Sequence, residues 1–191
     1  LTSFCIEIGQ TVSRNWHGYE RTEVQFATDP PNAGNPLSGV KIGVERAAAL
    51  DKLADNFWGL ATGGSLVDAV AFQLAVWEIV HESADALNNS LPGNLNVSQT
   101  QGTFFVDILS PAGNLLTAID KANDWLRDLP TLESNGGYSV IAITNPDRQD
   151  QLVQIPEPPA QSVAVPEPAA SLVWGVLAMA GITGYAWSRS S

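Results

Sequence analysis

Hydrophobic and polar positions follow a helical spacing in three segments of the chain. Residues 66–82 read LVDAVAFQLAVWEIVHE, in which apolar side chains recur every three or four positions. Residues 45–58 and 114–129 show the same spacing, and Gly59 is expected to end the first of them and Pro130 the second. The pattern therefore predicts three amphipathic helices in the middle of the chain.

Shorter runs that are rich in β-branched and aromatic residues lie around these helices. Each run is bounded by Gly, Pro, Asn or Asp, which is typical of strands that end in turns. The expected strands are residues 2–8, 22–27, 103–109, 138–144 and 151–155. Strands toward both ends, with helices between them, predict an α+β fold in which a β-barrel or β-sandwich carries a helical insertion.

The longest apolar run lies at the C-terminal end, from residue 169 to residue 187, and contains no charged side chain. As a helix it would be roughly 29 Å long, about the thickness of the hydrocarbon core of a bilayer. Aromatic residues toward its ends and Arg189 just after it are typical of a membrane span whose basic end faces the cytoplasm. We therefore expect residues 169–187 to form a single transmembrane helix and residues 188–191 to form a short cytoplasmic tail.

A proline-rich segment separates this run from the rest of the chain. Residues 156–168 read PEPPAQSVAVPEP, a composition that favours a stiff, extended linker. Residues 1–155 remain as an ectodomain, which is large enough to bury a core of its own. Because the chain opens with Leu-Thr-Ser, we expect either that a signal peptide has been removed or that the sequence is a fragment.

A Pro-Glu-Pro motif (Pro166, Glu167 and Pro168), the apolar run and Arg189 follow one another at the end of the chain. This tail resembles the PEP-CTERM sorting signal of exported bacterial proteins, although its basic end is a single Arg189 where a cluster is common. The resemblance implies that a membrane protease-transpeptidase, exosortase, recognises the tail and cuts near the motif. It also implies an exported protein that is anchored in the cell membrane or at the cell surface, or released to the extracellular matrix after cleavage. The alternative is an ordinary tail-anchored or single-pass membrane protein.

The charge of the chain narrows its range of partners. Asp and Glu number 20 against 9 Lys and Arg, and the net charge at pH 7 is −11. A negative field of this size repels nucleic acids and anionic membrane surfaces. We therefore expect no nucleic-acid partner, and we expect membrane contact only through the C-terminal helix.

Cys5 is the only cysteine of the chain, so it cannot form an internal disulfide. Lipidation of an N-terminal cysteine requires a small residue before it, whereas this chain has Phe4. Three possibilities remain for Cys5: a buried inert thiol, an intermolecular disulfide or a reactive thiol.

Gln73 is the polar exception on the apolar side of the helix expected over residues 66–82. At 100° per residue it lies in the middle of that side, whereas Asp68, Glu78 and Glu82 lie opposite. Burying an amide costs on the order of 1–3 kcal/mol unless it is hydrogen-bonded. We therefore expect a specific partner for Gln73.

Residues 4–8 (FCIEI) and 72–78 (FQLAVWE) contain this cysteine and this glutamine. Together the two segments resemble the thioester domains of bacterial surface adhesins. The resemblance implies that the Cys5 thiolate attacks the side-chain amide of Gln73, releases ammonia and forms an internal thioester. That family often has Thr before the glutamine, where this chain has Phe72.

A thioester is an activated acyl group, which a lysine amine or a hydroxyl can take to form a covalent link without a cofactor. Its target would be a surface, matrix or polysaccharide component whose identity is unknown. Phe4, Phe72 and Trp77 are expected to shield the bond from water, although aromatic residues of this kind are also common in plain cores. The alternative is a non-covalent structural or carbohydrate-binding module of the biofilm matrix, in which Cys5 is merely buried.

Other chemistries find little support in the sequence. His17 or His81 could pair with Cys5 as in a cysteine hydrolase, but no nucleophile motif surrounds Cys5. No calcium-loop motif, no cluster of cysteine and histidine, and no Gly-rich phosphate loop occurs in the sequence. We therefore expect neither an enzyme nor a bound metal or cofactor.

Overall fold

All three expected helices are formed, with somewhat different ends. The computed structural model describes residues 2–8, 18–27, 41–81, 95–98, 104–106, 113–134, 138–146 and 148–156. In chain order, the elements are β1 (Ser3–Cys5), β2 (Glu20–Thr22), the 3-10 helix η1 (Val24–Phe26), α1 (Val44–Gly63), α2 (Leu66–His81), α3 (Gly113–Asp128), the 3-10 helix η2 (Leu129–Thr131), β3 (Tyr138–Asn145) and β4 (Arg148–Pro156).

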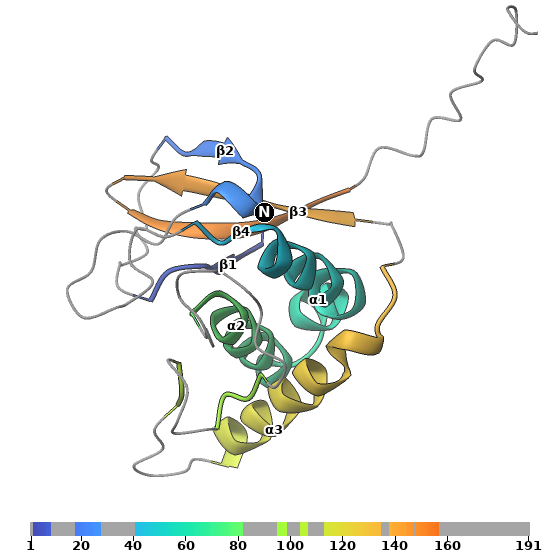
Figure 1. Cartoon of the computed structure of the whole chain (residues 1–191). Coiled ribbons are helices and arrows are strands. Elements are labelled where there is room, and N and C mark those ends of the chain that lie inside the picture. Colours follow the sequence, from blue (N-terminus) through green and yellow to red (C-terminus); the bar gives the residue numbers. More distant parts are fainter. Residues whose placement is uncertain are drawn as a thin grey trace, which may run out of the picture. The chain divides into compact units, whose positions relative to one another are not determined.

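The four strands form one antiparallel sheet in the order β1-β4-β3-β2. The hairpin of β3 and β4 is its centre, and the two three-residue strands pair with the outer edges of that hairpin. The helices lie on one side of the sheet (Figure 1), where α1 contacts β3, α2 contacts β1, and α3 packs on α2. The fold is therefore α+β, with α2 between the sheet and α3.

The expectation of a β-barrel or β-sandwich is wrong, because the sheet is open over the part of the chain that the structure describes. Two expected strands account for the difference. Within residues 22–27, only Thr22 belongs to a strand, and residues 24–26 form η1 instead. Within residues 103–109, the described residues 104–106 are not in a strand. The strand preference of β-branched and aromatic side chains depends on how they pack in the folded protein, so their presence alone did not specify strands.

The turn between α1 and α2 explains why α1 is longer than expected. α1 continues through Gly59, at a cost of roughly 1 kcal/mol relative to alanine, and the burial of Trp58 and Ala61 offsets this cost. The chain turns at Gly64, where an added Cβ would lie 2.4 Å from the carbonyl oxygen of Leu60. Glycine is therefore needed at the turn, which lies one residue beyond the last residue of α1.

Ser65 and Asp68 cap the first turn of α2 through reciprocal hydrogen bonds. The Ser65 N–H and hydroxyl donate to Asp68 Oδ2 at 2.8 and 2.7 Å, and the Asp68 N–H donates to Ser65 Oγ at 3.3 Å. Lys121 of α3 donates to Asp68 Oδ1 at 2.5 Å. Hydrogen bonds from Lys121 and then from Ser65 lower the pKa of Asp68 to about 2, so its carboxylate is charged at neutral pH and ties α3 to α2.

The buried side of α2 differs from the one that its periodicity indicated. Its fully buried residues include Ala71, Phe72, Ala75, Val76 and Ile79. Leu66 is 76% exposed, whereas Glu78, expected on the solvent side, is 1% exposed. Gln73, which was expected in the middle of the buried side, is only half-buried. α2 is packed by the sheet, α1 and α3 on several sides, so one apolar stripe does not mark its buried direction.

The expected C-terminal features lie outside the described residues. They are most of the linker at 156–168, the transmembrane helix at 169–187 and the short tail at 188–191, with Pro166, Glu167, Pro168 and Arg189 among them. Of the helices that the structure does describe, none has the length and apolar character needed to cross a bilayer.

Candidate functional site

Cys5 and Gln73 are in direct contact, although 68 positions separate them in the sequence. The backbone N–H of Cys5 donates to Gln73 Oε1 at 2.8 Å, and Gln73 Nε2 donates to the carbonyl oxygen of Cys5 at 2.7 Å. The side-chain amide of Gln73 and the backbone N–H and C=O of Cys5 thus form a hydrogen-bonded ring. The side-chain amide of Gln73 therefore lies against the backbone of Cys5.

The position of Cys5 in the sheet explains this pairing. β1 is an outer strand of the described sheet, and the Ile6 N–H that follows it donates to the Asp150 carbonyl of β4 at 3.0 Å. Backbone groups of successive residues in a strand point to opposite sides, so the N–H and C=O of Cys5 point away from β4. Gln73 reaches these outward groups from α2, which contacts β1.

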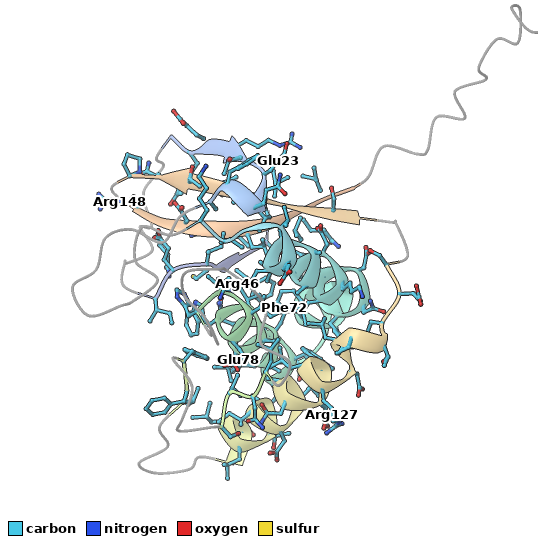
Figure 2. The ribbon with its side chains drawn as sticks, viewed as in Figure 1. Glu23, Arg46, Phe72, Glu78, Arg127 and Arg148 are labelled. Carbon is cyan, nitrogen blue, oxygen red and sulfur yellow. The ribbon has the colours of Figure 1, made fainter. Side chains whose placement is uncertain are left out.

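Three aromatic side chains join the strand that carries Cys5 to the helices α1 and α2. Phe4 precedes Cys5, Phe72 precedes Gln73, and their ring centroids are 4.5 Å apart. Trp58 of α1 contacts both rings edge-on, at 5.1 Å from Phe4 and 5.5 Å from Phe72. Phe72 is fully buried between the sheet and the helices (Figure 2), so this aromatic cluster of Phe4, Trp58 and Phe72 holds β1 against α1 and α2.

Trp77 has a different setting from the one expected for it. It is half-buried, and its ring packs against Phe104 at 6.2 Å between centroids. The aromatic residue that joins Phe4 and Phe72 is Trp58, which the sequence presented only as one apolar position of a helix. A one-dimensional pattern does not say which of six tryptophans reaches a given strand.

The environment of the Cys5 thiol favours its protonated form. Burial, and then the negative charge of Glu7, raise the pKa of Cys5 above its ordinary value. The thiol is half-buried and has no disulfide partner. It therefore keeps its proton at neutral pH and reacts slowly with reagents in solution.

The segment that carries Cys5 is held at three successive carbonyl groups. The Cys5 carbonyl accepts from Gln73, the Ile6 carbonyl accepts from His81 Nε2 at 2.8 Å, and the Glu7 carbonyl accepts from Gln149 Nε2. The Glu7 carboxylate in turn accepts from the Asp150 N–H at 3.0 Å. We call residues 5–7 the cysteine segment; α2 holds it from one side and β4 from the other.

Sequence reasoning missed the residues that position the cysteine segment. The sequence indicated His81 only as a partner of the Cys5 thiol in a cysteine hydrolase, whereas its Nε2 contacts the Ile6 carbonyl, and Gln149 only as a polar residue before an expected strand. Their role depends on hydrogen bonds to backbone atoms, which leave no spacing pattern in the sequence. Among the described residues, no group of three His, Cys, Asp or Glu side chains could hold a metal ion.

No protein-family model, curated protein or solved structure matches the chain. What the site can do follows from its own chemistry: a cysteine whose thiol favours the protonated form, and whose backbone is hydrogen-bonded to the carboxamide of Gln73.

Proposed function

We propose that this protein is an exported surface or matrix protein in which Cys5 and Gln73 form an internal thioester for covalent attachment to amine or hydroxyl targets. The observation that carries the proposal is the pair of hydrogen bonds between the side-chain amide of Gln73 and the backbone of Cys5. Glutamine has many possible partners in a core, and here its partner is the only cysteine of the chain.

The chemistry of bond formation balances with the groups present. The sulfur of Cys5 bonds to the side-chain carbonyl carbon of Gln73, and the bond from that carbon to Nε2 breaks. The thiol proton leaves with the nitrogen, so ammonia is the only other product. Negative charge develops on Oε1 during this step, and the Cys5 N–H already donates to that oxygen at 2.8 Å.

Attachment uses the same carbonyl carbon. A primary amine of the target bonds to it, the carbon–sulfur bond breaks, and one amine proton passes to the sulfur. The products are a stable amide and the free Cys5 thiol, whose raised pKa favours the protonated form. Each molecule attaches once, so the protein is a reagent and not an enzyme.

Intact mass tests the bond itself. We expect the purified protein to be lighter than its sequence by one ammonia, and its thiol to resist alkylation in the native state, because the sulfur is already acylated. Cys5→Ala and Gln73→Ala should each restore the full mass expected for the variant. A native protein of full sequence mass would show that no thioester forms, even if its protonated thiol alkylates only slowly.

The same hydrogen bonds would also satisfy a glutamine with a purely structural role. A full-mass protein would therefore favour the second candidate function, a non-covalent structural or carbohydrate-binding module of a biofilm matrix. Such a module would bind its target reversibly, and denaturation would separate the two.

Sorting by exosortase is proposed from the tail sequence, in which Pro166, Glu167 and Pro168 precede the apolar run and Arg189 follows it. In a host that has exosortase, the surface form of the protein should lack residues 169–187, because cleavage falls near the motif. Peptide mapping of surface fractions measures this. Recovery of the apolar run still joined to the ectodomain would indicate a permanent membrane anchor.

A further inference from the structure

We infer that His81 and Gln149 are positioning residues for the proposed thioester, because they fix the cysteine segment once the amide nitrogen of Gln73 has left as ammonia. The inference rests on the proposed function and assigns a role to two residues outside the reacting pair. Both side chains are buried, His81 at 4% and Gln149 at 5% exposure.

His81 gives α2 a second point of attachment to the cysteine segment. It lies about two helical turns after Gln73 on the same helix. Its Nε2 donates to the carbonyl of Ile6, the residue that follows Cys5. Because a carbonyl can only accept, Nε2 must carry the proton. One attachment would let the segment pivot, whereas attachments at two successive residues fix its direction along α2.

Gln149 holds the next residue from the opposite side. Its side chain comes from β4 and donates to the carbonyl of Glu7, while the N–H of Ile6 donates to Asp150. The cysteine segment is therefore held between a helix and a strand that belong to different layers of the fold.

The reaction itself removes one of these attachments. When Nε2 of Gln73 leaves as ammonia, the Cys5 carbonyl loses the donor that was 2.7 Å away. The new carbon–sulfur bond joins the two residues but allows rotation about its neighbouring single bonds. The hydrogen bonds from His81 and Gln149 do not involve the reacting atoms, so they persist. They keep the Cys5 N–H directed at the thioester oxygen and keep the segment packed over the bond.

The test compares the lifetime of the thioester in neutral buffer among variants of the full chain. Hydrolysis converts Gln73 to glutamate, and intact mass follows it over time. His81→Leu, which has no donor, should hydrolyse roughly fivefold to tenfold faster than the wild type, as expected for one lost hydrogen bond. His81→Gln, which can donate to the same carbonyl, should restore most of the lifetime.

A matched control separates positioning from general loss of stability. Asn123 of α3 accepts from the Val97 N–H at 2.9 Å, away from the cysteine segment. Asn123→Leu should lower the melting temperature without shortening the lifetime of the thioester. Gln149→Met removes the donor from the β4 side and tests the same role if His81→Leu does not fold.

The outcomes distinguish this inference from the proposed function. A wild-type protein without a thioester contradicts both. A wild-type thioester whose lifetime is unchanged in His81→Leu and Gln149→Met contradicts the positioning role alone. Equal shortening in the Asn123→Leu control would show that the lifetime depends only on overall stability, which would also overturn the positioning role.

Discussion

Treatment of the purified protein with methylamine should abolish its covalent attachment to targets. In the proposed thioester, methylamine takes the acyl group of Gln73 and releases the Cys5 thiol, so that no activated carbonyl remains for a lysine of the target. The expected loss is essentially complete, because each molecule carries one proposed bond. Target complexes that survive denaturing electrophoresis measure the effect, and the mass of the treated protein should rise by one methylamine relative to the thioester form.

Gln73→Ala gives the same test without a reagent, provided that thermal melting shows it to be folded. It should form no denaturation-resistant complex, whereas Asn123→Leu should attach as the wild type does. If the treated protein still attached irreversibly, Cys5 and Gln73 would not be the attachment site. Reversible binding that methylamine leaves unchanged would support the non-covalent module.

The second large effect is expected in the core. Phe72→Ala should reduce the free energy of unfolding by about 3–5 kcal/mol, because it empties the fully buried centre of the aromatic cluster formed with Phe4 and Trp58. Urea unfolding measures this loss. The fraction of protein that carries the proposed thioester should fall with it, since the contact between Phe4 and Phe72 holds the strand of Cys5 against the helix of Gln73.

Phe26→Ala is the control for that variant. The ring of Phe26 is 51% exposed, so its removal should change the free energy of unfolding by less than about 1 kcal/mol. A loss for Phe72→Ala no larger than that for Phe26→Ala would contradict the view that the aromatic cluster holds β1 against the helices.

The three helices could be predicted from hydrophobic spacing, and their ends could be predicted less well. The end of α1 shows why: Gly59 resembles a stop, but the buried residues beyond it continue the helix to Gly63. The real stop is Gly64, whose need for glycine comes from close contacts with Leu60 and Asp68. The contact with the Leu60 carbonyl is made within α1 itself, whereas the contact with Asp68 exists only once α2 is in place.

The architecture was less predictable than its parts. The runs at 138–144 and 151–155 do lie in the central hairpin, but the run at 22–27 became mainly η1, and no second sheet is present among the described residues. Pairing between distant strands depends on which surfaces the helices cover, and local composition does not contain this information.

The reacting pair and its surroundings differ in how the sequence reveals them. Cys5 and Gln73 could be named in advance because two short segments resemble a known family, and the structure places these two residues in contact. The burial of Glu78 and the backbone contacts of His81 and Gln149 could not be predicted. Each of them depends on backbone atoms from a different part of the chain, such as the Asn96 N–H that donates to Glu78.

The outer position of β1 gives the Cys5–Gln73 contact a second consequence. Free N–H and C=O groups on an outer strand can pair with a strand of another molecule, which is a common route to aggregation. At Cys5 both groups are already occupied by Gln73, so an incoming strand would first have to displace the amide. The hydrogen bonds between Gln73 and Cys5 thus also hinder strand pairing at this point of the outer strand. Loss of ammonia would return the Cys5 carbonyl to the edge as an open acceptor.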